Sequence, residues 1–346
     1  MGKRKRYYSP YETVARWIEI NRGELAFSGK TIDDWRKWRR KFRARLVRNL
    51  GKMPERVPLR AETLSREDMG TFVREKVVYD TEACASVPAY VLIPKGLKRG
   101  EKCPGVLAAH GHGIGKNPLV GLDGDEKPHE DYQKVLGIQL VERGYVVVAP
   151  DWRGFGERMS PVDWVRPTRD KCNVNSMAEG YRGFYFLALQ IWDGFRTLDY
   201  LQSRKEVDGK RLGCLGVSYG GTMTTYLAAL DRRIRVACVS GYLSTLRHGA
   251  MQGRANFCGA QYMPGLAAIG DIPDVIGLIA PRPLVVEMGE KDPGFAISDA
   301  ERAYRHISKI YRVAGVRDAL VKDRFDGQHE FSGKKSLAWF DKWLKG

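Results

Sequence analysis

The sequence lacks any apolar run that approaches the roughly 18–20 residues a helix needs to cross a membrane. Its basic start, Met-Gly-Lys-Arg-Lys-Arg, is not followed by the apolar segment of a secretory signal peptide. The six cysteines are scattered, without the C-x-x-C spacing of zinc or redox motifs. These absences predict a cytoplasmic protein with reduced thiols, no metal ion and no cofactor.

Acidic residues are scarce at the start of the chain. Residues 1–60 hold 18 Lys and Arg against 6 Asp and Glu, in a protein of 346 residues with a formal net charge of +17. Thr31 is a candidate N-cap for a basic helix. One apolar stripe recurs at helical spacing along it: Trp35, Trp38, Phe42, Leu46 and Leu50. We expect a basic helical extension over residues 1–70 that packs on the core, and no nucleic-acid partner.

Beyond residue 70, apolar segments alternate with helical ones. Residues 71–93 predict an antiparallel strand pair at a sheet edge. Later strands are expected at 105–109, 145–149, 212–217, 234–239, 284–288 and 319–325, with helices at 131–143, 192–201, 222–230 and 336–344. Strands that are apolar throughout and separated by helices indicate a mainly parallel sheet with helices on both faces. The fold class is therefore α/β, with one catalytic domain over 71–346.

Two long irregular stretches, near 155–188 and 241–273, leave the carboxyl ends of expected strands, where ligands bind in such sheets. We interpret them as a pocket rim or lid. Their aromatic residues are expected to line a covered pocket: Phe155, Trp164, Tyr181, Phe184, Tyr185, Tyr242, Phe257 and Tyr262.

The segment Gly216-Val-Ser-Tyr-Gly220 has the G-x-S-x-G pattern of a nucleophilic serine on a tight strand-to-helix turn. Side chains two residues to either side of that serine would collide, and glycine removes the collision. Ser218 is therefore the candidate nucleophile. The amide of Tyr219, at a helix N-terminus, is a candidate donor to a developing negative charge.

A serine hydroxyl needs a base to take its proton, usually a histidine that a carboxylate orients. Three histidines follow Ser218 in the sequence. His306 lies within an expected helix and His248 in the irregular rim. His329 lies in the loop after the last strand and is the candidate base.

The acid is expected just after the strand 284–288. Asp292 is the preferred candidate there, and Glu290 is the alternative. A second oxyanion donor is expected in the glycine-rich loop after residue 109, from the amide of His112, or otherwise of Gly113. His110 and His112 could also be metal ligands, but no neighbouring Cys, Asp or Glu in the sequence completes a ligand set.

Six segments carry a resemblance to a known family: His110-Gly-His-Gly, Pro150-Asp-Trp-Arg-Gly-Phe-Gly-Glu, Gly216-Val-Ser-Tyr-Gly-Gly, Ala280-Pro-Arg-Pro-Leu, Glu290-Lys-Asp-Pro and Gly327-Gln-His-Glu-Phe. Over about residues 70–346 the chain resembles the α/β-hydrolases of the dienelactone-hydrolase-like and acetyl-xylan-esterase-like group. The resemblance implies an ester hydrolase with a triad of Ser218, Asp292 and His329, and an oxyanion hole formed by the amides of His112 and Tyr219. Dienelactone hydrolases themselves use cysteine where this chain has serine.

The leading hypothesis is a serine carboxylesterase that acts on small ester substrates through an acyl-enzyme. The covered pocket predicts short acyl groups, with acetyl esters of sugars among the substrates. Two alternatives remain: a serine peptidase of the prolyl-oligopeptidase type, and a nucleic-acid-binding protein built on the basic N-terminal helix. The oligomeric state is left open, and a homo-oligomer is compatible with the sequence.

Overall fold

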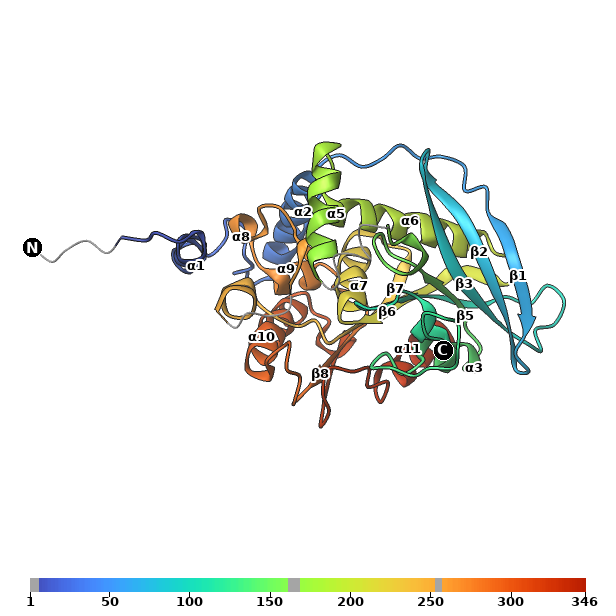
Figure 1. Cartoon of the computed structure of the whole chain (residues 1–346). Helices are drawn as coiled ribbons and strands as arrows, with labels where there is room; N and C mark the ends of the chain where they lie inside the picture. Colours follow the sequence, from blue (N-terminus) through green and yellow to red (C-terminus); the bar gives the residue numbers. More distant parts are fainter. Residues whose placement is uncertain (1–5, 161–168, 253–256) are drawn as a thin grey trace, which may run out of the picture.

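A computed structural model describes residues 6–160, 169–252 and 257–346. Nine strands from these residues form one sheet in the order β1-β2-β3-β5-β4-β6-β7-β8-β9 (Figure 1). The strands are β1 (Glu62–Asp68), β2 (Phe72–Glu82), β3 (Ala85–Pro94), β4 (Cys103–Ala109), β5 (Val146–Pro150), β6 (Val207–Val217), β7 (Ile234–Ser240), β8 (Leu284–Gly289) and β9 (Leu320–Phe325).

The sheet has an antiparallel edge and a parallel remainder. β2 and β3 form the expected antiparallel pair, with Phe72 opposite Pro94. β3 then pairs antiparallel with β5, and every later neighbour, from β5 through β4 to β9, is parallel. The carboxyl ends of β4, β6, β7, β8 and β9 therefore meet at one edge of the sheet, so the loops that follow these strands are brought together.

The sheet begins earlier than the sequence predicts. Residues Glu62–Asp68, which we expected within the helical extension 1–70, form the edge strand β1 against β2. All seven residues of β1 are exposed. Because no side chain of this strand is buried, its sequence carries none of the apolar alternation from which a strand is inferred.

Helices cover both faces of the sheet. α6, α7, α9 and α10 contribute buried residues to the core on one face, and α3 and α11 to the core on the other. The helices are α1 (Pro10–Ile20), α2 (Ile32–Asn49), α3 (Leu136–Glu142), α5 (Arg169–Tyr181), α6 (Phe186–Ser203), α7 (Tyr219–Leu230), α8 (Leu266–Ile269), α9 (Ile272–Gly277), α10 (Ile297–Val313) and α11 (Ser336–Leu344). Along the part of the chain that the structure describes, no helix is both long and apolar enough to cross a membrane.

The helix expected over 131–143 is shorter than its sequence pattern suggests. α3 begins only at Leu136, because Lys134 and Val135 adopt positive φ angles of 51° and 45°. A residue with positive φ cannot continue a right-handed helix. Residues 131–135 thus form a turn that carries Tyr132 toward the carboxyl edge of the sheet.

α2 packs against the core through the stripe that its sequence predicts. Thr31 and Asp34 form a capping box at its start. The buried residues of this stripe are Trp35, Trp38, Phe42, Leu46 and Leu50. Arg39 and Arg43 donate to the core carbonyls of Ala280 and Leu230 at 3.2 and 2.9 Å. Two of its basic side chains are thus engaged by the core.

α1 makes a looser contact. It has no buried residue, and Figure 1 shows it at the end of the molecule opposite β1–β3, beside α8.

Candidate active site

Ser218 lies on the strained turn between β6 and α7. Its backbone has φ 60° and ψ −119°, outside the regions that non-glycine residues normally occupy. A Cβ on Gly216 would lie 2.3 Å from the carbonyl oxygen of Ala109, and a Cβ on Gly220 would lie 1.9 Å from the same atom. Glycine at both positions therefore lets the loop after β4 press directly against the serine turn.

His329 and Asp292 lie in the loops that follow the neighbouring strands β9 and β8. The Nδ1 atom of His329 is 2.7 Å from Oδ2 of Asp292. The other carboxylate oxygen, Oδ1, accepts from the amides of Gly294 and Phe295 at 2.8 and 2.9 Å. The Asp292 side chain is only 2% exposed. Both oxygens of this carboxylate are thus committed, and one of them holds the imidazole.

Short backbone contacts fix the two loops against each other. The amide of Lys291 donates to the carbonyl of Gly327 at 2.9 Å. A Cβ on Gly289 would lie 2.1 Å from the carbonyl oxygen of Gln328. The close approach that Gly289 permits therefore sets the distance between the acid and the histidine.

The competing carboxylates have other partners. Glu290, the alternative acid, pairs with Arg324 at 2.7 Å on the surface. Asp326 pairs with Lys291 at 2.5 Å. Of the two candidates in the loop after β8, it is Asp292 that the fold brings to His329.

The other two histidines after Ser218 lie elsewhere. The Nε2 atom of His306, on α10, is 2.7 Å from Oδ1 of Asp274. His248 lies on the helical segment Leu246–Gln252 of the rim.

Two aromatic rings enclose the imidazole of His329. The ring of Phe295 stacks on it at 5.6 Å between centroids and an interplanar angle of 12°. Tyr132 stacks on it at 5.6 Å and 27°. Gly241, after β7, also lies close, because a Cβ there would be 3.2 Å from Cε1 of His329. These contacts hold the ring plane in one orientation.

Tyr132 connects the histidine, the serine and the glycine-rich loop. Its phenol donates to the carbonyl of His112 at 2.8 Å. Burial raises the pKa of this phenol, and the nearby hydroxyl of Ser218 opposes that rise. A Cβ on Gly111 would lie 1.9 Å from the Tyr132 oxygen, so the loop must have glycine there. The sequence gives no sign of this role, because Tyr132 belongs to no motif and lies in a turn that we expected to be helical.

The two expected oxyanion donors come from the loop after β4 and from the start of α7. Tyr219 is the first residue of α7, where backbone amides have no partner within the helix. The loop containing His112 packs on the Ser218 turn through Gly216 and Gly220, as described above. The amide of Gly111 donates to Oε1 of Gln133 at 2.7 Å, which gives the loop a second fixed point.

His110 fixes the glycine-rich loop after β4 through hydrogen bonds. Its Nε2 accepts from the amide of Trp152 at 3.0 Å, and its Nδ1 donates to the carbonyl of Gly111 at 2.7 Å. Only a neutral imidazole can accept and donate in this way. Burial lowers the pKa of His110 to about 4, which keeps it neutral. The side chain of His110 therefore has a structural role. Because both of its ring nitrogens have partners, His110 does not share a metal site with His112.

The side chain of His112 has thiol neighbours that the sequence did not reveal. Its Nε2 lies 3.2 Å from Sγ of Cys258, and Cys172 of α5 lies beside both. No residue near His112 in the sequence completes a ligand set, but the fold brings these two distant cysteines beside it. A hydrogen bond to Cys172 lowers the pKa of the Cys258 thiol well below its ordinary value, and His112 contributes to the same shift.

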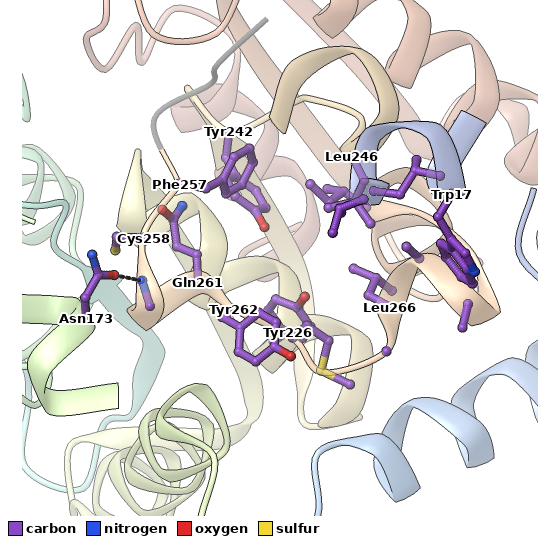
Figure 2. Close-up of a pocket in the computed structure, with 18 residues that line it drawn as sticks. Trp17, Asn173, Tyr226, Tyr242, Leu246, Phe257, Cys258, Gln261, Tyr262 and Leu266 are labelled. Atoms are coloured by element: carbon purple, nitrogen blue, oxygen red, sulfur yellow. Dashed lines mark hydrogen bonds between the residues drawn. The ribbon is translucent and has the colours of Figure 1, made fainter. Parts of the chain in front are cut away.

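An apolar cavity of about 540 Å³ lies between the rim and the N-terminal helix (Figure 2). Aromatic residues on its wall include Trp17, Tyr226, Tyr242, Phe257 and Tyr262. Phe257 and Tyr242 pack edge-on against Phe295, at 5.9 and 6.1 Å, and Phe295 stacks on His329. A continuous set of ring contacts therefore links the cavity to the histidine.

Not all the aromatic residues expected at the pocket are there. Tyr181 is 91% exposed at the end of α5, and Tyr185 is 44% exposed. Phe155 is fully buried between the rings of His110, His112 and Tyr219. Trp164 lies outside the described residues. The composition of the rim does not tell which of its rings point inward. Tyr181 points outward, for example, because it lies on the exposed end of α5.

The mainly parallel sheet with helices on both faces, together with a serine turn at the carboxyl edge, is the architecture of the α/β-hydrolases. The chain belongs to the Abhydrolase family, which matches residues 2–326. It is 30% identical over 315 residues to YtaP of Bacillus subtilis (strain 168), which covers 87% of this chain and 98% of that protein.

Solved structures share the fold at lower identity. The structure of BF1801 from Bacteroides fragilis NCTC 9343 superposes with a TM-score of 0.79 at 18% identity, covering 98% of this chain and 90% of that one. Acetyl xylan esterase 1 from Thermoanaerobacterium sp. JW/SL YS485 gives 0.59 at 17% identity, covering 98% of each chain. A glucuronoyl esterase from Solibacter usitatus gives 0.63 at 18% identity, covering 93% and 96%.

Proposed function

We propose that this protein is a serine carboxylesterase in which Ser218 is the nucleophile, His329 the general base and Asp292 the orienting acid. The single observation that carries the proposal is the pair of His329 and Asp292, 2.7 Å apart, at the sheet edge where the strained turn presents Ser218. Ser218 attacks the ester carbonyl while His329 takes its proton and then gives that proton to the leaving alcohol. Water, activated by the same histidine, then hydrolyses the acyl-enzyme.

The amides of His112 and Tyr219 are proposed to stabilise the negative oxygen of the tetrahedral intermediate. Support comes from Tyr132, which holds the carbonyl of His112 at 2.8 Å and so orients the peptide bond between His112 and Gly113. Tyr219 opens α7, where the helix dipole favours negative charge.

Short-acyl esters, with acetyl esters of sugars among them, are the proposed substrates. Two fold neighbours are named as esterases of carbohydrate substrates, an acetyl xylan esterase and a glucuronoyl esterase. The rings of Phe295 and Phe257 pack in series from His329 outward, and we expect a long acyl chain beside the base to collide with them.

Single substitutions test the catalytic assignment. Ser218→Ala and His329→Ala are each expected to lower kcat on p-nitrophenyl acetate by roughly 10³–10⁶-fold, with the fold intact by circular dichroism. Ser86→Ala and His129→Ala change an exposed serine and an exposed histidine and serve as matched controls. Turnover near the wild-type value in His329→Ala would mean that another group is the base.

A further inference from the structure

Three soft-metal ligands from three separate segments converge beside the proposed active site. They are Nε2 of His112 in the loop after β4, Sγ of Cys172 on α5, and Sγ of Cys258 just before the turn Gly259–Gln261. All three atoms lie within 4.8 Å of one another, and the His112 and Cys258 atoms are 3.2 Å apart.

These distances suit a tetrahedral ion. Zinc binds thiolate sulfur at about 2.3 Å and imidazole nitrogen at about 2.0–2.1 Å, which puts neighbouring ligand atoms about 3.5–3.8 Å apart at tetrahedral angles. The widest separation here is at most 4.8 Å, so it must close by no more than about 1 Å as the ion binds. One imidazole with two thiols is also a donor set that selects zinc over hard ions such as magnesium.

Contacts between the residues next to the two cysteines hold their segments together. Asn173, next to Cys172, accepts from the amide of Gly259, next to Cys258, at 2.8 Å (Figure 2). A Cβ on Gly259 would lie 2.8 Å from the carbonyl oxygen of Cys172, so only glycine allows this approach.

The third ligand is held equally firmly. Tyr132 anchors the carbonyl of His112, and the rings of Phe155 and Tyr219 pack against its imidazole at 5.5 and 5.0 Å. The three segments that carry the ligands are therefore held together before any ion arrives, which reduces the entropic cost of binding.

We propose that His112, Cys172 and Cys258 form a binding site for a single Zn²⁺ ion, with its fourth position left to water or another small ligand. Among the described residues, no fourth His, Cys, Asp or Glu groups with these three. Cys258 also lines the apolar cavity. Each thiol releases its proton to solvent as its sulfur binds, so the ion is held as a complex of one neutral imidazole and two thiolates.

Cobalt titration tests this directly. The reduced, chelator-washed protein is titrated with Co²⁺, which reports thiolate ligands through charge-transfer absorption and tetrahedral geometry through its visible bands. We expect one Co²⁺ per chain, displaced by Zn²⁺. The bands should be lost in Cys172→Ser and in Cys258→Ser, and kept in Cys84→Ser, which changes an exposed thiol outside the cluster. The Ser218→Ala protein should bind Co²⁺ equally well, because the site does not depend on esterase activity.

A further variant tests the site independently, in case the cysteine variants do not fold. His112→Ala removes one ligand and leaves both thiols, and it should weaken Zn²⁺ binding by more than about tenfold. Undiminished thiolate bands in Cys258→Ser, or no Co²⁺ binding by the folded wild-type protein, would overturn the proposal. So would a Cys172–Cys258 disulfide that persists in the reduced protein, detected by mass after thiol alkylation.

Discussion

Tyr132 stacks on the imidazole of His329 at 5.6 Å and 27°, while its phenol donates to the carbonyl of His112 at 2.8 Å. One side chain thus touches both the proposed base and the proposed oxyanion loop. It comes from a turn between β4 and α3 that no motif marks.

Removing the phenol oxygen should disturb the oxyanion loop and leave the stacking on His329 in place. We expect Tyr132→Phe to lower kcat on p-nitrophenyl acetate by about tenfold with little change in KM, because one hydrogen bond that positions the transition-state donor is lost. Tyr145→Phe is the matched control, since its buried phenol binds Asp341, away from the site. An unchanged kcat in Tyr132→Phe would show that the loop holds its shape without this contact.

The two carboxylates after β8 should differ sharply in importance. Asp292→Asn keeps an oxygen for the amides of Gly294 and Phe295 but presents an NH₂ group to Nδ1 of His329, which forces the wrong imidazole tautomer. We expect a loss in kcat of about 10⁴-fold. Glu290→Gln should stay within about twofold of wild type, because Glu290 pairs with Arg324 at the surface. The reverse order in steady-state kinetics would move the acid to Glu290.

The acyl-chain length that the enzyme prefers should depend on the rings beside His329. We expect kcat/KM on p-nitrophenyl esters to peak between acetyl and butyryl, since each methylene group that cannot be accommodated costs about 1–3 kcal/mol. Phe257→Ala opens the ring series between Phe295 and the cavity and should move the peak to longer chains. Tyr181→Ala, which changes a ring that is 91% exposed, should leave it in place. A wild-type maximum at octanoyl or beyond would point to a lipid-like substrate.

His110 should make the fold sensitive to mild acid. Its pKa falls from 6.5 to about 4 in the folded protein because of burial. Between these values the unfolded chain binds one more proton, so the free energy of unfolding should fall by about 1.4 kcal/mol per pH unit as the pH drops. Above pH 6.5 the effect vanishes. Urea denaturation across this range should show this fall in the wild-type protein and in His129→Asn, which changes an exposed histidine. The fall should be absent in His110→Asn.

We expect a buried ion network next to the site to contribute strongly to the free energy of unfolding. The guanidinium of Arg153 binds both oxygens of Asp193, at 2.7 and 2.9 Å, and Asp193 is completely buried. Arg153→Met removes the bidentate partner of that carboxylate but leaves Arg158 at 2.8 Å, so it should lower the free energy of unfolding by about 3 kcal/mol. Arg36→Met, which breaks an exposed pair with Asp33, should cost less than about 1 kcal/mol by the same denaturation measurement.

The sequence was sufficient for the features whose cause is local. Strands that are apolar throughout indicate a buried parallel sheet, and the expected strands after residue 70 all occur in it. The G-x-S-x-G spacing marks the tight turn around Ser218 in the sequence, although the shortest collision that each glycine avoids is with the carbonyl oxygen of Ala109 on β4. The strand order then places the loops with His112, Asp292 and His329 at one edge, as their positions after β4, β8 and β9 predict, and their catalytic roles stay predictions.

Tertiary structure decided whatever depends on contacts between distant segments. Tyr132 and His329 stack only because the turn before α3 and the loop after β9 meet at the same edge. His112 and Cys258 are 146 residues apart in sequence, and Cys172 reaches them from a third segment. No local pattern encodes such a meeting, because side-chain periodicity reports which face of an element is buried but not which residue of another element it meets. The exposed strand β1 escaped detection for the related reason that hydrogen bonding to β2, and not burial, holds it in the sheet.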